Sequence, residues 1–138
     1  MALAGTAGGV CSWLLGGWNG TATVLLVLMA IDYLTGIIGA AVFHVSTKSE
    51  TGALESKAGW KGLVRKCLTL LLVIVAAMLD RLLGTAFVRD AVIIAFCANE
   101  ALSIVENAAL MGVPVPAAVR RAIEVLNEKA EGEHHDGT

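Results

Sequence analysis

Five polar side chains interrupt the third long apolar stretch of this sequence. The stretch, at about residues 89–113, reads RDAVIIAFCANEALSIVENAALMGV. Its polar members in the central part are Asn99, Glu100, Ser103, Glu106 and Asn107. At 100° per residue they fall on one helical stripe about 120° wide, and aliphatic residues cover the other side. Carboxyl and amide groups inside a bilayer are costly unless protein or water surrounds them, so this stripe is the main candidate site.

The stripe has two interpretations. It lines an aqueous lumen formed by several copies of the chain, or it packs against other helices with its carboxyls hydrogen-bonded or neutral. We favour the lumen, because three thin spans offer few partners for five polar groups. No nucleophile–base pair, phosphate-binding loop or metal-ligand spacing accompanies these residues, so we expect neither enzyme activity nor a cofactor.

A further acid, Asp32, lies at the middle of the first apolar stretch, at about the depth of Glu100. Two ionised acids at one depth repel each other, so one is expected to be protonated or paired with a base. Arg81 and Arg89 are the candidate bases near the outer ends of the spans. Burial of Asp32 in the subunit or in an assembly contact is the alternative. A small-residue face follows one turn later and predicts close helix packing; it consists of Gly36, Gly39 and Ala40.

The elements that must position these residues are three apolar stretches, at about 22–45, 67–87 and 89–113. Each is about as long as the ~20 residues that cross ~30 Å of hydrocarbon. The chain is 57% apolar and 16% charged, with a mean hydropathy of +0.75, which is too apolar for an ordinary soluble domain. We therefore predict an all-α membrane protein, with a three-span domain over residues 22–116. The net charge of −2 argues against nucleic acid as a partner.

The flanking segments differ in composition. Residues 1–21 are uncharged and contain tryptophan, which is typical of a segment in the headgroup region, although a floppy tail is equally compatible. Residues 46–66 form a basic loop that could include a short interfacial helix around Trp60. Residues 117–138 are expected to form an amphipathic helix to about residue 129 and then a solvated, acidic tail. Cys11, Cys67 and Cys97 show no ligand or disulfide spacing and are expected to be structural.

Lysine and arginine near the span ends predict the topology. The first loop is basic and the N-terminal segment has no base, so the N-terminus is expected outside and the C-terminus in the cytoplasm. The bases assigned to topology and anionic-lipid contact are Lys57, Lys61, Arg65 and Lys66. At the outer turn we expect solvated interfacial charges that anchor a hairpin, and these are Asp80, Arg81, Arg89 and Asp90.

Three blocks of the sequence resemble a known family. MAIDYLTGIIGA at 29–40, SKAGWKGLVRK at 56–66 and NEALSIVENAALMGVPVP at 99–116 are similar to the signature blocks of the toxin-secretion/phage-lysis holin family. The resemblance covers about residues 22–126. The family's shared positions map onto Asp32, Tyr33, Gly36, Gly59, Trp60, Gly62, Asp80, Glu100, Ser103, Glu106 and Asn107.

The resemblance implies a phage- or prophage-encoded, multi-pass protein of the host's inner (cytoplasmic) membrane. Such proteins oligomerise and permeabilise the membrane at a set time, releasing an endolysin or a toxin without requiring direct contact with it. The expected partners are thus other copies of the chain and membrane lipids. A dedicated toxin or bacteriocin export pore, or an accessory subunit of a larger membrane complex, is the alternative.

Overall fold

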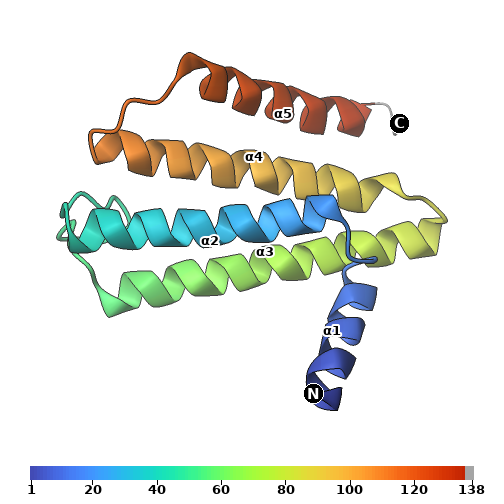
Figure 1. Ribbon diagram of the computed structural model, residues 1–138. Coiled ribbons are helices and arrows are strands. Elements are labelled where there is room, and N and C mark those ends of the chain that lie inside the picture. Colours follow the sequence, from blue (N-terminus) through green and yellow to red (C-terminus); the bar gives the residue numbers. More distant parts are fainter. Residues whose placement is uncertain (136–138) are drawn as a thin grey trace.

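The computed structural model describes residues 1–135, and this part of the chain is built from α-helices joined by turns and loops. The helices are α1 (Ala2–Leu14), α2 (Gly20–Ala41), α3 (Ser56–Leu83), α4 (Phe87–Leu110) and α5 (Ala117–His135). Helices α2, α3 and α4 lie side by side, α5 runs back along α4, and α1 projects away from the bundle (Figure 1). The all-α prediction is confirmed.

The core of the bundle lies where α2, α3 and α4 meet. Its fully packed members are Leu25, Met29, Val73, Ile93 and Cys97. They recur at helical spacing on the inner faces of the three helices, so burying one face of each builds one apolar core. Of the cysteines, Cys97 belongs to this core, whereas Cys11 and Cys67 are exposed.

Two helices, α2 and α3, are long and apolar enough to cross a membrane. Only 17% of the most apolar window of α3 is buried inside the subunit, so α3 differs from the core helix of a soluble protein, which would be mostly covered. Large apolar side chains stand exposed along both helices, as lipid contact requires: Val24, Val27, Ile31, Leu34, Ile38, Leu68, Leu71, Leu72, Val75, Leu79 and Leu82. The predicted third span corresponds to α4. Helix α4 carries the polar stripe, and it is not one of the two helices that are apolar enough to cross a membrane.

The structure corrects several boundaries. Residues 56–66, predicted as part of a loop, form the first three turns of α3. No proline interrupts them, and helix-favouring Lys, Ala, Leu and Arg residues continue into the apolar segment. Residues 2–14 are helical and exposed rather than a floppy tail. Helix α5 continues through residues 131–135, which were expected to begin the tail; residues 136–138 of that tail lie outside the described residues.

Capping residues, glycine and proline determine where the helices begin and end. Asn19 caps α2 by accepting a 3.1 Å hydrogen bond from the Ala22 backbone N–H through its side-chain oxygen. Gly84 ends α3 in the left-handed conformation, with φ of 69°, where a side chain would be strained. Pro114 and Pro116 follow α4 and cannot continue a helix, so the chain turns back there into α5.

Candidate functional site

A buried ion triad connects the three central helices. The ammonium group of Lys66 on α3 donates to Asp32 Oδ2 on α2 at 2.7 Å and to Glu100 Oε2 on α4 at 2.6 Å. The carboxylate side chains are 5% and 9% exposed and that of Lys66 is 15% exposed. Such short, charge-assisted bonds are stronger than neutral ones. One cation therefore holds two acids, and with them all three helices, at one level of the bundle.

The depth of the triad follows from the helix ends. Asp32 lies nine residues before the end of α2, Lys66 ten residues after the start of α3, and Glu100 ten residues before the end of α4. These three ends lie at the same side of the bundle in Figure 1. At a rise of ~1.5 Å per residue, each charge is about 15 Å from that side.

Lys66 has a different role from the one predicted. From the sequence we expected Lys66 to serve topology and lipid contact, and we expected Arg81 or Arg89 to be the partner of the intramembrane acids. The partner is Lys66, because the helix that carries it begins at Ser56. Lys57, Lys61 and Arg65 are exposed on the first turns of α3, and their assignment to topology and lipid contact stays a prediction.

Asp32 has two further polar neighbours, the Lys48 ammonium at 4.0 Å from Oδ2 and the Asn107 amide. Nδ2 of Asn107 donates to Asp32 Oδ1 at 3.2 Å and to Thr35 Oγ1 at 3.0 Å, and it lies 3.4 Å from the Asp32 carbonyl oxygen. The small-residue face of α2 permits this approach: a Cβ added at Gly36 would lie 3.9 Å from Asn107 Nδ2, and one at Gly39 would meet Met111 at 3.9 Å. The predicted small-residue face thus lies against α4 of the same subunit.

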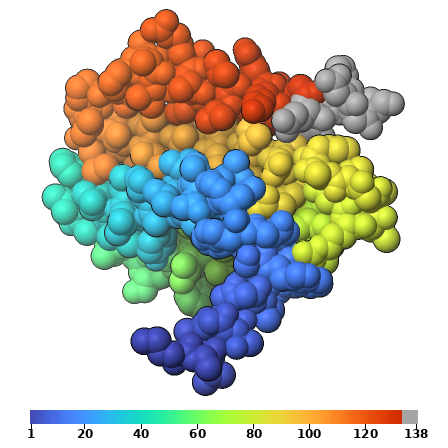
Figure 2. Space-filling view, turned by 45° about the vertical axis from the view of Figure 1, so that its right-hand side comes forward, coloured from blue at the N-terminus to red at the C-terminus, as the bar shows by residue number. Residues whose placement is uncertain are grey.

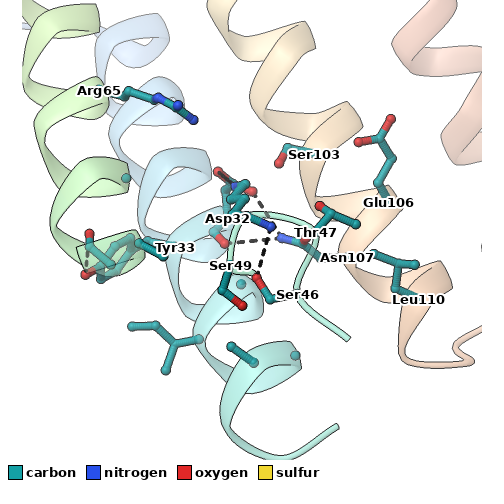
Figure 3. A pocket seen from close by; sticks show the side chains of 18 of the residues that line it. Asp32, Tyr33, Ser46, Thr47, Ser49, Arg65, Ser103, Glu106, Asn107 and Leu110 are labelled. Carbon is teal, nitrogen blue, oxygen red and sulfur yellow. Dashed lines mark hydrogen bonds and ion pairs between the residues drawn. The ribbon is translucent and has the colours of Figure 1, made fainter. Parts of the chain in front are cut away.

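The five-residue stripe of α4 divides into two parts. Glu100 is buried and Asn107 half-buried, and both are bonded within the subunit. Ser103 is half-buried, while Asn99 and Glu106 are exposed. Figure 3 shows Ser103 and Asn107 turned toward Asp32 and Glu106 directed away from it. Contacts within the subunit therefore supply hydrogen-bond partners for Glu100 and Asn107, whereas Asn99 and Glu106 lie at the surface.

A groove lined by both polar and aliphatic side chains leads from the loop end of the bundle to the triad. It is a partly open cavity of about 510 Å³ whose floor is α2 and whose walls are the first half of α3, the second half of α4 and the loop between α2 and α3. Acids, bases, hydroxyls and amides line it, and the labelled side chains in Figure 3 show this mixture. Its volume and the polar groups within it are sufficient to hold ordered water.

The α2–α3 contact beside the groove rests on two glycines. The Tyr33 ring lies against α3, where a Cβ at Gly62 would be 3.7 Å from Tyr33 Cε2 and one at Gly59 would be 3.6 Å from its hydroxyl oxygen. The Tyr33 hydroxyl donates to the Gly59 carbonyl at 3.3 Å. Trp60, between the glycines, is 67% exposed on the outer side of α3. Two of the three sequence blocks therefore meet at this contact.

The charges at the α3–α4 turn are not all solvated, which corrects the expectation for this turn. Asp80 is 7% and Arg89 6% exposed. The Asp80 carboxylate accepts from the backbone N–H groups of Val88 at 3.0 Å and Arg89 at 2.9 Å, and from Thr85 Oγ1 at 2.6 Å. It therefore caps the start of α4, where the first amide groups lack helical partners and favour an anion.

Arg89 binds the turn between α1 and α2. Its guanidinium donates to the carbonyls of Leu15 and Gly17, the latter at 2.9 Å, and to Asp90 at 3.0 Å. Gly16 has φ of 83°, and a Cβ there would lie 2.7 Å from Arg89 Cδ, so only glycine fits this turn. Burial of Arg89 is stabilised because carbonyl oxygens replace water around the charge.

Arg81 holds the end of α1. It donates to the Trp13 carbonyl, and its guanidinium carbon lies 4.0 Å from the centroid of the Trp13 ring, a distance at which a cation is attracted to the ring face. Asp90 remains half-exposed, at 49% of its side chain. In the described part of the chain, no group of three or more His, Cys, Asp or Glu residues is placed to hold a metal ion.

Comparisons with known proteins find one matching family and several similar proteins. A family model described as the bacteriophage holin family matches residues 9–128. A Clostridium perfringens protein named "Uncharacterized 14.9 kDa protein in nagH 3'region" is 37% identical over 124 residues, covering 88% of each chain. The uncharacterized protein Lin0175 of Listeria innocua is 36% identical over 132 residues, covering 94% of this chain and 89% of its own.

A phage protein is also similar. The "Probable holin" of Bacillus phage phi105 is 38% identical over 104 residues, which cover 75% of this chain and 71% of the phage protein. No solved structure matches the chain. The matched region contains the triad, the groove and both arginines of the α3–α4 turn.

Proposed function

The chain belongs to the bacteriophage holin family, and from this membership we propose that it assembles in a bacterial cytoplasmic membrane and permeabilises it at a set time. The lesion would release an endolysin, or a toxin, without direct contact between that cargo and the protein. The partners are other copies of the chain and the surrounding lipids. We further propose that α2, α3 and α4 each cross the membrane, with the N-terminus outside and the C-terminus in the cytoplasm.

The observation that carries this proposal is the division of the α4 stripe. Asp32, Lys66, Glu100 and Asn107 satisfy one another inside a single subunit, so a subunit surrounded by lipid can hold these groups without water. Asn99 and Glu106 remain exposed on the same helix. Glu106 lies four residues before the end of α4, where an ionisable group that faces acyl chains costs less than the ~2.5–3.5 kcal/mol of the bilayer centre. This smaller cost still favours arrangements in which neighbouring copies or water surround Glu106.

The number of subunits per membrane area then explains the delay before permeabilisation. A dilute subunit keeps its polar groups in the groove and the triad, and its exposed apolar side chains contact lipid. As copies accumulate, polar faces of neighbours meet, and water that enters with them stabilises the exposed acid and amide. Beyond a threshold density the hydrated assembly is favoured over dispersed subunits, and the membrane opens.

Expression in a bacterium tests the proposal. The protein should stop growth after a reproducible delay and, when an endolysin is present in the cytoplasm, lyse the cells abruptly. Purified protein in vesicles should release dyes of graded size above a threshold density. Continued growth at high membrane levels, together with vesicles that retain every dye, contradicts the proposal.

A substitution in the stripe tests the physical cause. Glu106→Leu should insert normally and delay or abolish dye release, because the acid that favours hydration is gone. Glu50→Leu is the matched control, since Glu50 is also exposed but lies in the loop before α3, and it should leave the timing unchanged. If Glu106→Leu releases dye at the wild-type density, Glu106 does not drive the hydration of the assembly.

A further inference from the structure

Helix α5 gives the subunit one face that lipid cannot cover. Six charged side chains of α5 are exposed, and they are Arg120, Arg121, Glu124, Glu128, Lys129 and Glu131. Figure 1 shows α5 running back along α4 rather than extending from its end. If α4 crosses the membrane, this placement puts the charges of α5 beside a membrane-spanning helix, where hydrocarbon strongly disfavours them.

The contact between α5 and α4 is nevertheless specific. Ile123 is 6% and Ala130 7% exposed, and α4 is the helix that α5 contacts. The two residues are seven apart, on one side of α5, while Val125 between them is 61% exposed. One apolar side of α5 is therefore seated on α4, while its charged side chains are exposed. Figure 2 shows α5 (orange to red) along the outer edge of the molecule beside α4.

The opposite side of the bundle has the reverse character. Helix α3 lies on the far side of α2 and α4 from α5 in Figure 1. After its basic first turns, the exposed surface of α3 consists largely of leucine and valine up to Arg81. The folded subunit thus has an apolar side on α3 and a charged side on α5. A protein with one lipid-compatible side and one water-compatible side has the asymmetry of a pore-wall subunit.

We propose that α5 packs on α4 only where that side of the subunit is hydrated, so that in the open assembly α5 faces the lumen. In a subunit surrounded by lipid, α5 leaves α4 and lies in the aqueous phase at the cytoplasmic surface. The seated helix adds its charges to the lumen wall and covers part of α4 there. This inference rests on the proposed pore-forming function and assigns the water-facing surface of that pore mainly to α5.

Distance measurements between spin labels test the inference in vesicles. Labels are placed on Ala95→Cys in the first half of α4 and Glu131→Cys near the end of α5, both exposed positions, in full-length protein whose three native cysteines are replaced. Packed helix axes lie ~8–10 Å apart, so a seated α5 should give distances below about 20 Å once the label arms are included. A detached α5 should give distances above about 30 Å, because most of both helix lengths then separates the labels.

A matched control pair fixes the behaviour of α4 itself. Labels on Ala95→Cys and Leu110→Cys, 15 residues apart on one helix, should stay about 22 Å apart under all conditions. Dye release is recorded from the same vesicles. We expect only long distances for the α4–α5 pair in dilute, dye-tight vesicles, and a short-distance population that grows in step with dye release.

Two results overturn the inference while leaving the pore-forming function intact. One is a short distance in dye-tight vesicles, which would seat α5 on α4 in lipid. The other is a set of leaky vesicles in which only long distances occur. Vesicles that never leak at any density contradict the pore-forming function instead, and the dye measurement distinguishes that failure from the other two.

Discussion

Replacing Lys66 by methionine is the most informative perturbation of this subunit. The change keeps the length of the side chain and removes the cation that Asp32 and Glu100 share. Both carboxylates would then be left buried, at 5% and 9% exposure of their side chains, without their common partner. Loss of one member of a buried ion pair costs about 3–5 kcal/mol. Two hydrogen bonds to charged groups, at ~1.5–3 kcal/mol each, give a similar total.

This cost should appear in two measurements. The free energy of unfolding in detergent micelles should fall by about 3–5 kcal/mol, followed by circular dichroism across a denaturant series. In cells, growth arrest should begin earlier at equal membrane levels, because the arrangement that holds the three helices together in one subunit is weakened. Arg65→Met is the control: Arg65 precedes Lys66 directly but is exposed, so its loss should change stability by less than about 1 kcal/mol.

A triple variant separates lost charge pairing from a general defect. In Asp32→Asn, Lys66→Met, Glu100→Gln, no ion remains to be left unpaired, and replacing a whole buried ion network is often neutral. The triple variant should therefore recover most of the stability that Lys66→Met loses. If Lys66→Met behaves like Arg65→Met, or if the triple variant is less stable than Lys66→Met, ion pairing in the triad does not hold the three helices of the subunit together.

Three further perturbations test the rest of the fold. Asp80→Ala should lower the free energy of unfolding by about 1–2 kcal/mol through loss of the α4 cap, whereas an equal loss in Asp90→Ala, where the side chain is half-exposed, would speak against the cap. Gly62→Ala should be tolerated, since the new Cβ lies 3.7 Å from the Tyr33 ring. Gly62→Leu should lower the free energy of unfolding by about 1–3 kcal/mol, because it forces α2 and α3 apart; equal unfolding midpoints for these two variants would refute this. Arg89→Gln should free the α1–α2 turn, so amide hydrogen exchange should rise at residues 15–19 and stay unchanged in the core around Ile93; unchanged exchange in the turn would contradict the role of Arg89.

The helical class and the buried acids could be predicted from the sequence, whereas the residues that pair with these acids could not. Polar residues in apolar stretches are costly wherever they lie, so Asp32 and Glu100 could be singled out without a structure. Their shared base could not, because Lys66 stands at the edge of an apolar stretch and looks like a topology signal. Placing the start of the helix at Ser56 would have brought Lys66 opposite Asp32, since antiparallel helices pair residues equally far from their common end.

The α3–α4 turn shows a second limit. Asp80, Arg81, Arg89 and Asp90 are close in sequence to a turn, and charges near a turn are usually solvated. The burial of Arg89 depends on the turn at Gly16, which folds back onto it from more than seventy residues earlier. A contact of that kind depends on tertiary packing and leaves no periodic signal in the sequence.

The exposed charges at the two ends of the apolar part of α3 also define how thick a membrane the subunit matches. These charges, Arg65 and Arg81, are 16 residues apart on the helix, which corresponds to about 24 Å. The hydrocarbon layer of a typical bilayer is ~30 Å thick. We therefore expect lipids to shorten around each subunit, at a cost of fractions of a kcal/mol per Å of mismatch. Subunits that share one thinned patch divide this cost among them, so the elasticity of the bilayer itself would draw dispersed copies together.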